Sequence, residues 1–213
     1  MWTISELNFR IGPSKDFEIY YVLPRGAELT VINFDWDNEW TQILYQDDIG
    51  YVYTSYLSED YIHPYDYYYM YEGGQIEELD FALQEYIQDI LTEWGCRDFY
   101  KIFLCQAYQE SRYNMNSIGR AHGGYNDYGI MQIWEGHAVD PHSHAYHIIQ
   151  QHPNYKTNPY DNIYIGLWIW HEWYKATGDY ITALGCYLSG TIVPDQYYIS
   201  CVLYHLDFLH KEE

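Results

Sequence analysis

The hydrophobic pattern of this chain changes its period once, and that change divides the chain into two parts with different folds. Over residues 1–58, short runs of β-branched and aromatic residues alternate with turn sequences such as Pro24-Arg25-Gly26. Five short strands with tight turns predict a small β-barrel. From Ile76 the apolar residues recur at helical spacing as far as Trp94, and Gly95 follows as a stop signal. The second part is therefore expected to be mainly α-helical.

The later helices are predicted from the same spacing and from Gly and Pro boundaries. They are expected from about residue 98 through Glu110, from 158 to 178, from 181 to 187 and from 194 to about 210. Residues 59–75 are rich in tyrosine and show neither a helical nor a clean strand period. The sequence thus predicts a β domain over 1–58, a tyrosine-rich linker over 59–75 and a mainly α domain over 76–213.

The charge of the chain excludes some classes of partner. It has 31 acidic residues against 10 basic ones, a formal net charge of −21. Phosphate backbones need a basic surface, so we expect no nucleic-acid partner, and an anionic membrane is disfavoured for the same reason. No stretch approaches the roughly 18 apolar residues of a membrane-spanning helix. The opening residues 1–6 carry neither the basic region nor the apolar core of a signal peptide.

The cysteines and histidines do not show an established metal-ligand spacing. Four cysteines, at 96, 105, 186 and 201, allow either three disulfide pairings or buried free thiols. Five histidines lie close together at positions 137, 142, 144, 147 and 152. Their spacing is not that of a known zinc site, so we expect a polar loop and no metal or other cofactor.

Glu110 is the residue whose position most strongly suggests chemistry. Phe99, Phe103 and Ala107 precede it by eleven, seven and three residues, so they share its face of a helix. A carboxylate on an apolar face loses hydration, which raises its pKa and keeps it protonated near neutral pH. A general acid that cleaves a glycosidic bond needs this property.

Several motifs in the first part resemble one known family. Residues 7–14 (LNFRIGPS) resemble the LNVRSGPS signature that opens bacterial SH3-like (SH3b) domains. Trp40, residues 50–52 (GYV) and residues 55–58 (SYLS) are similar to its later landmarks, in the same order. The resemblance implies an all-β SH3-like barrel that binds cell-wall peptides. A structural spacer is the alternative, because a fold does not fix a function.

The second part resembles the lysozyme-like lytic transglycosylases (SLT type) and goose-type lysozymes. Glu110-Ser111 followed by residues 129–132 (GIMQ) is similar to the ES and GLMQ pair of that superfamily. Residues 158–166 (NPYDNIYIG) are similar to its DPxxNIxxG segment, and residues 179–187 (DYITALGCY) to the helix that ends in AYNAG. The expected fold class is therefore multidomain, a small all-β SH3-like barrel plus a mainly α lysozyme-like domain.

The resemblance implies roles for individual positions. Glu110 would be the catalytic acid and then base, and the hydroxyl of Tyr187 would approach it. Substrate would be bound by Ser111, Tyr128, Met131 and Gln132. Where the family has Asn after the tyrosine, this chain has Leu188, which puts the substrate preference in doubt.

The resemblance also implies the reaction and its location. The expected activity is cleavage of peptidoglycan between N-acetylmuramic acid and N-acetylglucosamine by one glutamate, with 1,6-anhydro ends as products. The partners would be peptidoglycan glycan strands and stem or cross-bridge peptides. The protein would act outside the cell or in the cell wall, by an export route that the sequence leaves open.

Asp127 keeps a second reaction open. Goose-type lysozymes carry a carboxylate in this region, and hydrolysis usually needs two carboxyl groups. Asp127 would then hold a water and make the protein a hydrolytic muramidase, whereas a turn-forming Asn126-Asp127 pair is the structural alternative. A non-catalytic wall-binding protein is the third hypothesis.

Overall fold

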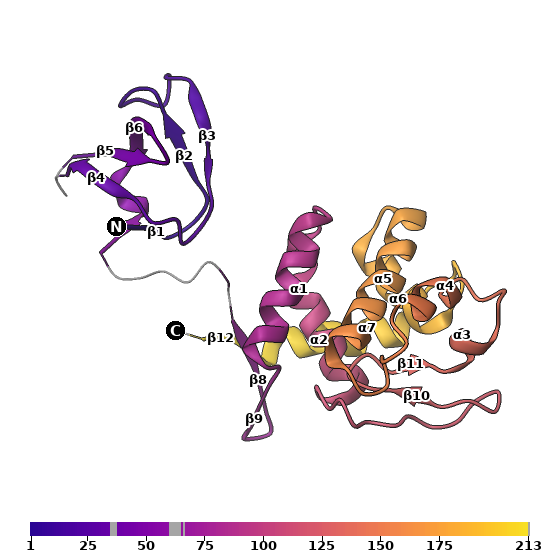
Figure 1. Cartoon of the computed structure of the whole chain (residues 1–213). Coiled ribbons are helices and arrows are strands. Elements are labelled where there is room, and N and C mark those ends of the chain that lie inside the picture. Colours follow the sequence, from indigo (N-terminus) through magenta and orange to yellow (C-terminus); the bar gives the residue numbers. More distant parts are fainter. Residues whose placement is uncertain (35–37, 60–64, 66, 213) are drawn as a thin grey trace. The chain divides into compact units, whose positions relative to one another are not determined.

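The computed structural model describes residues 1–34, 38–59, 65 and 67–212 (Figure 1). The chain forms two compact units, Met1–Asp66 and Tyr67–Glu213. The first is built of strands and the second mainly of helices. This confirms the predicted fold class.

The first unit is an antiparallel β structure around one small core. Its five-stranded sheet has the order β3-β2-β6-β5-β4, with β2 at Leu7–Arg10, β3 at Ile19–Leu23, β4 at Thr30–Asn33, β5 at Trp40–Tyr45 and β6 at Asp48–Tyr53. The short strand β1 (Trp2–Thr3) pairs with β7 (Leu57–Ser58), which follows the single-turn helix η1 (Thr54–Tyr56). Phe9, Leu23, Ile43 and Val52 are fully buried in the core. At Gly50 a Cβ atom would lie 2.5 Å from the carbonyl oxygen of Arg10, so the approach of β6 to β2 requires glycine.

The second unit begins with a sheet that the sequence did not predict. β8 (Tyr68–Glu72) pairs with β9 (Gln75–Glu78) across Gly73-Gly74, both at positive φ, and with the C-terminal strand β12 (Leu209–Lys211). Residues 68–72 lie in the segment that we expected to be a linker. Residues 60–64 and 66 of that segment lie outside the described residues. Tyr68 and Met70 alternate inward in β8 and are buried, which ties this strand to the helical core.

Seven α-helices follow in the described part of the chain. They are α1 (Phe81–Glu93), α2 (Tyr100–Ser111), α3 (Gly136–Val139), α4 (Tyr146–Gln151), α5 (Pro159–Thr177), α6 (Tyr180–Ser189) and α7 (Gln196–Tyr204), with the 3-10 turns η2 (Arg97–Phe99) and η3 (His205–Phe208). The first helix begins at residue 81, because Asp80 caps it by accepting a hydrogen bond from the Ala82 amide. Residues 75–78, where we expected its first turn, form β9 instead. The last helix ends at residue 204 and not near 210, because residues 209–211 pair with β8.

The long helix α5 organises the core of this unit. Asn158 caps its start, Pro159 occupies its first turn, and Gly178 ends it in the left-handed conformation. Its Trp170 ring is fully buried and stacks on Phe99 at 3.6 Å between centroids. No helix in the described part of the chain has the length and apolar character needed to cross a membrane. The four cysteines are free thiols.

Candidate functional site

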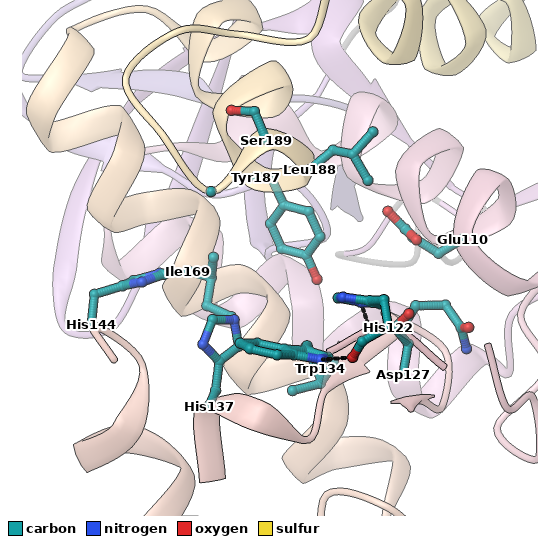
Figure 2. A pocket seen from close by; sticks show the side chains of 13 residues that line it. Glu110, His122, Asp127, Trp134, His137, His144, Ile169, Tyr187, Leu188 and Ser189 are labelled. Carbon is teal, nitrogen blue, oxygen red and sulfur yellow. Dashed lines mark hydrogen bonds and ion pairs between the residues drawn. The ribbon is translucent and has the colours of Figure 1, made fainter. Parts of the chain in front are cut away.

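A cleft of about 370 Å³ opens in the helical unit between the end of α2, the β10–β11 region and the end of α6. β10 (Asp127–Tyr128) and β11 (Ile133–Trp134) form a two-stranded antiparallel sheet that contributes Asp127, Ile133 and Trp134 to its lining. Figure 2 shows the side chains that line the cleft. They are Glu110, His122, Asp127, Gln132, Ile133, Trp134, His137, His144, Ile169, Tyr187, Leu188, Ser189 and Gly190.

Glu110 lies in the last turn of α2, where its carboxyl faces the cleft. Burial raises its pKa from 4.5 to about 7, and the nearby charge of Asp127 acts in the same direction. The hydroxyl of Tyr198, on α7, donates a hydrogen bond to Glu110 Oε1, which lowers the pKa against these two effects. Near neutral pH Glu110 therefore exists in both forms, so it can donate a proton and also accept one.

The end of α2 is held by contacts from five consecutive side chains to five different parts of the unit. Two of these contacts reach the β8–β9 hairpin: Tyr108 donates to Glu72 Oε2 on β8 at 3.0 Å, and Arg112 donates to Glu77 Oε1 on β9 at 3.3 Å. Two reach the C-terminal elements: Gln109 Oε1 lies 2.8 Å from His205 Nε2 on η3, and Glu110 accepts from Tyr198 on α7. In the fifth, Ser111 donates to the Ile130 carbonyl oxygen at 2.9 Å. The hairpin β8–β9 thus contributes to the position of Glu110, although it lies far from it in sequence.

The segment Gly129–Gln132 is shaped by a buried asparagine of α5. Asn162 accepts a hydrogen bond from the Met131 amide at 2.8 Å and donates to the carbonyl oxygens of Tyr128 at 2.9 Å and Tyr155 at 3.0 Å. Gly129 has φ of +78°, and a Cβ there would lie 2.4 Å from Asn162 Nδ2. Glycine is therefore required at 129, and the side chain of Asn162 replaces the regular backbone pairing that this irregular segment lacks.

The predicted site residues separate into two groups. Glu110, Asp127, Gln132 and Tyr187 line the cleft. Ser111, Tyr128 and Met131 are not among the described residues that line it. Met131 is fully buried, and Tyr128 has the Lys156 ammonium 4.4 Å above its ring.

Tyr187 and Tyr198 occupy different places around Glu110. We expected the Tyr187 hydroxyl to approach Glu110, and this hydroxyl donates to the Met131 carbonyl oxygen at 2.7 Å. Burial raises the pKa of Tyr187 well above its usual range, and the charge of Glu110 adds to the shift, so the two side chains interact electrostatically. The hydrogen bond to Glu110 comes from Tyr198, which we did not single out among 28 tyrosines.

Gln132 has its side chain directed to the backbone. Its amide Nε2 donates to the carbonyl oxygens of Gly129 at 2.7 Å and Ser117 at 3.4 Å. Its own backbone lies at φ of +47°, which is uncommon outside glycine. Gln132 thus holds the loop before β10 against the segment that follows it.

Two aromatic residues that the sequence did not single out support Asp127. His122 Nε2 lies 3.2 Å from Asp127 Oδ1, and the His122 ring stacks on Trp134 with centroids 5.2 Å apart and planes 12° apart. Trp134 Nε1 donates to the His122 carbonyl oxygen at 3.4 Å. Neither residue belongs to a motif that we recognised, and His122 lies in a loop, where the hydrophobic pattern carries no information.

Burial favours the neutral form of the two other histidines of the cleft. Burial lowers the pKa of His137 to about 4 and also lowers that of His144. Among the described residues no group of three or more His, Cys, Asp or Glu side chains could hold a metal ion. His137 packs edge-on against Trp134, with centroids 5.2 Å apart, and the two rings form part of the cleft wall.

Leu188 makes the wall near Tyr187 apolar. Its side chain lines the cleft and is 51% exposed. Ser189 and Gly190 follow it, and Gly190 ends α6 in the left-handed conformation. At this place the cleft offers an aliphatic surface, where the resemblance described above led us to compare Leu188 with an asparagine.

Comparison with known families gives two matches, in the same order as the two units. Residues 5–58 match the family described as Bacterial SH3 domain, and residues 97–196 match the family described as Transglycosylase SLT domain. No curated protein and no solved structure matches the chain. The second match includes all of the residues that line the cleft.

Proposed function

We propose that this chain, a bacterial SH3 domain followed by a transglycosylase SLT domain, cleaves peptidoglycan between N-acetylmuramic acid and N-acetylglucosamine and leaves 1,6-anhydro ends. The SLT domain implies peptidoglycan lytic transglycosylase-type activity, and both domains imply peptidoglycan binding. The observation that supports the finer mechanism is Glu110, a carboxyl in the cleft whose pKa is raised to about 7.

In the first step Glu110 donates its proton to the glycosidic oxygen that leaves with N-acetylglucosamine. The bond between that oxygen and C1 of N-acetylmuramic acid breaks, and positive charge develops on the sugar ring. Proton donation by a positioned acid contributes about 10²- to 10⁴-fold to such a rate. The raised pKa keeps this proton available near neutral pH.

In the second step the C6 hydroxyl of the same N-acetylmuramic acid attacks C1. Glu110, now a carboxylate, takes the proton of that hydroxyl, and the 1,6-anhydro ring closes. The attacking group is already part of the bound substrate, so its proximity replaces a second catalytic carboxyl. The acid form of Glu110 is regenerated, and no water is consumed.

The other predicted residues have supporting roles in this proposal. Tyr187 fixes the Met131 carbonyl and forms the wall beside Glu110. Gln132 lines the cleft and contacts the sugar there, while its amide nitrogen holds the loop backbone. Ser111, Tyr128 and Met131 do not line the cleft and support substrate binding by shaping the loop around Gly129. Leu188 offers methyl groups where an amide would otherwise contact the sugar, so the substrate preference differs there.

The SH3 domain would bring the enzyme to its substrate. We propose that it binds stem or cross-bridge peptides of the wall and that the protein acts outside the cell or in the cell wall. A protein with a net charge of −21 is repelled by anionic wall polymers at long range, so short-range contacts must supply the binding.

Hydrolysis is the second candidate, and one observation favours it. Asp127 lines the same cleft, and its charge reaches Glu110 strongly enough to affect the pKa. If Asp127 orients a water, the enzyme is a muramidase and its products have reducing ends.

Replacement of Glu110 by Gln tests the proposal. The amide has nearly the same shape but no proton to donate, so we expect Glu110→Gln to release no soluble fragments from purified peptidoglycan and to sediment with it as the wild type does. Glu93→Gln, which removes an exposed carboxylate at the end of α1, is the matched control and keeps full activity. Binding without release by the wild type on several walls would make this a non-catalytic wall-binding protein.

A further inference from the structure

The loop that carries His122 is built to hold that residue in place. The His122 amide donates to the Tyr125 carbonyl oxygen at 2.9 Å, and the Tyr125 amide donates to the His122 carbonyl oxygen at 3.1 Å. Between them Gly123 and Gly124 take positive φ values of 59° and 87°, as a tight two-residue turn requires. The backbone of His122 is therefore fixed at the base of a small hairpin.

Two contacts also fix the imidazole ring. It stacks on Trp134, and its Nε2 lies 3.2 Å from Asp127 Oδ1. The backbone at Gly136 packs directly against the indole ring of Trp134, since a Cβ atom at Gly136 would lie only 2.3 Å from that ring. This contact restricts the position of Trp134. A stacked ring with one nitrogen bonded to a carboxylate has a defined orientation in the cleft.

The bond to Asp127 determines which nitrogen is free. An ionised carboxylate can only accept, so Nε2 of a neutral His122 carries the proton and Nδ1 keeps its lone pair. Nδ1 makes no hydrogen bond within the described part of the chain. The His122 side chain is 60% exposed, so water reaches this side chain. An imidazole whose other nitrogen is bonded to a carboxylate is the usual form of a general base.

Glu110 lies in the same cleft, in a different environment from His122. Figure 2 shows Glu110 and His122 around the same pocket, with Glu110 coming from α2 and Asp127 from β10. Burial raises the pKa of the Glu110 carboxyl to about 7, whereas the His122 side chain is exposed beside a carboxylate. Two titratable groups in such different environments are suited to be an acid and a base in one reaction.

We infer that His122, positioned by Asp127 and Trp134, is a general base that lets water compete with the C6 hydroxyl for C1 of N-acetylmuramic acid. The inference rests on the proposed function, because it uses the same bond cleavage by Glu110. Water attacks C1 while its proton passes to Nδ1 of His122. The bond from C1 to the leaving oxygen breaks, and that oxygen takes the proton of Glu110. The product is a reducing end, and the enzyme thus forms two kinds of end from one substrate.

The ratio of the two ends tests this role. Anhydro ends are one water lighter than reducing ends and resist borohydride, so mass spectrometry of reduced fragments from purified peptidoglycan counts both. We expect the wild type to give both kinds of end, and His122→Ala to lower the ratio of reducing to anhydro ends by about 100-fold, the lower end of the range for general base catalysis. Because a ratio is measured, a loss of total activity does not affect the result. Added imidazole should restore part of the reducing ends in His122→Ala.

His147→Ala is the matched control for His122→Ala. His147→Ala removes another exposed imidazole, which packs on Trp168 and does not line the cleft, and should leave the ratio unchanged. An unchanged ratio in His122→Ala would overturn the inference, as expected of a surface ion pair without a catalytic role. Anhydro ends alone from the wild type would also overturn it and leave the proposed function intact. No release by the wild type would overturn the proposed function, and the inference with it.

Discussion

The raised pKa of Glu110 predicts a pH-dependent difference in stability between the wild type and Glu110→Gln. A carboxyl whose pKa is about 7 in the folded state and 4.5 when exposed keeps its proton on folding throughout that interval. The unfolded chain binds fewer protons there, so the free energy of unfolding falls as the pH rises from about 4.5 to about 7. At about 1.4 kcal/mol per pKa unit, this shift corresponds to about 3 kcal/mol.

Glutamine does not titrate, so the free energy of unfolding of Glu110→Gln lacks this decrease with rising pH. Relative to the wild type, Glu110→Gln should gain about 3 kcal/mol between pH 4 and pH 8. A difference of this size shifts Tm by several degrees in a unit of about 150 residues. Thermal unfolding of both full-length proteins, followed by circular dichroism at half-unit steps of pH, measures the difference directly.

Glu93→Gln is the control, because it removes an exposed carboxylate from the same unit. Its stability difference from the wild type should stay nearly constant over this pH range. If the difference between Glu110→Gln and the wild type is also constant, Glu110 has an ordinary pKa. Glu110 would then be ionised near neutral pH and could not serve there as the general acid.

Three further predictions concern the surroundings of Glu110. Tyr198→Phe removes the hydrogen bond that lowers the pKa of Glu110, so the alkaline limb of the pH profile of kcat/KM should move to higher pH. An unmoved limb would contradict this. Asn162→Ala leaves three backbone groups in the interior without their hydrogen-bond partner, so urea unfolding should show a free energy of unfolding lower by about 3 kcal/mol. A decrease of less than about 1 kcal/mol would show that the Gly129–Gln132 segment does not depend on Asn162. Glu72→Ala removes the hydrogen-bond partner of the Tyr108 hydroxyl and should lower kcat about 10-fold with KM unchanged. Glu72→Gln can still accept this hydrogen bond and should keep most of the activity. Equal effects of the two variants would contradict a positioning role for Glu72.

Much of the fold follows from local signals in the sequence. Asn158, Asp179 and Asp195 each accept a hydrogen bond from an amide in the first turn of the helix that follows, as expected of N-caps. The helical spacing of Phe99, Phe103 and Ala107 identified the apolar face on which Glu110 lies. These signals are local, because they depend on neighbours within one or two turns.

The unpredicted features depend on residues far apart in the sequence. β8 pairs with residues 209–211, and no local period in a tyrosine-rich segment indicates a partner at the other end of the chain. Tyr198 and Tyr187 lie on separate helices, so only their packing decides which hydroxyl reaches Glu110. The orientation of His122 likewise depends on Trp134 and Asp127, which the chain brings to it through the β10–β11 pair.

In the proposed reaction Glu110 cleaves the glycan with the help of the C6 hydroxyl of the substrate. The most direct test is the mass of the muramic acid ends in fragments that the full-length wild-type protein releases from purified peptidoglycan. We expect 1,6-anhydro ends, one water lighter than reducing ends, that disappear in Glu110→Gln. Reducing ends alone would contradict it, because water and not the C6 hydroxyl would then be the attacking group.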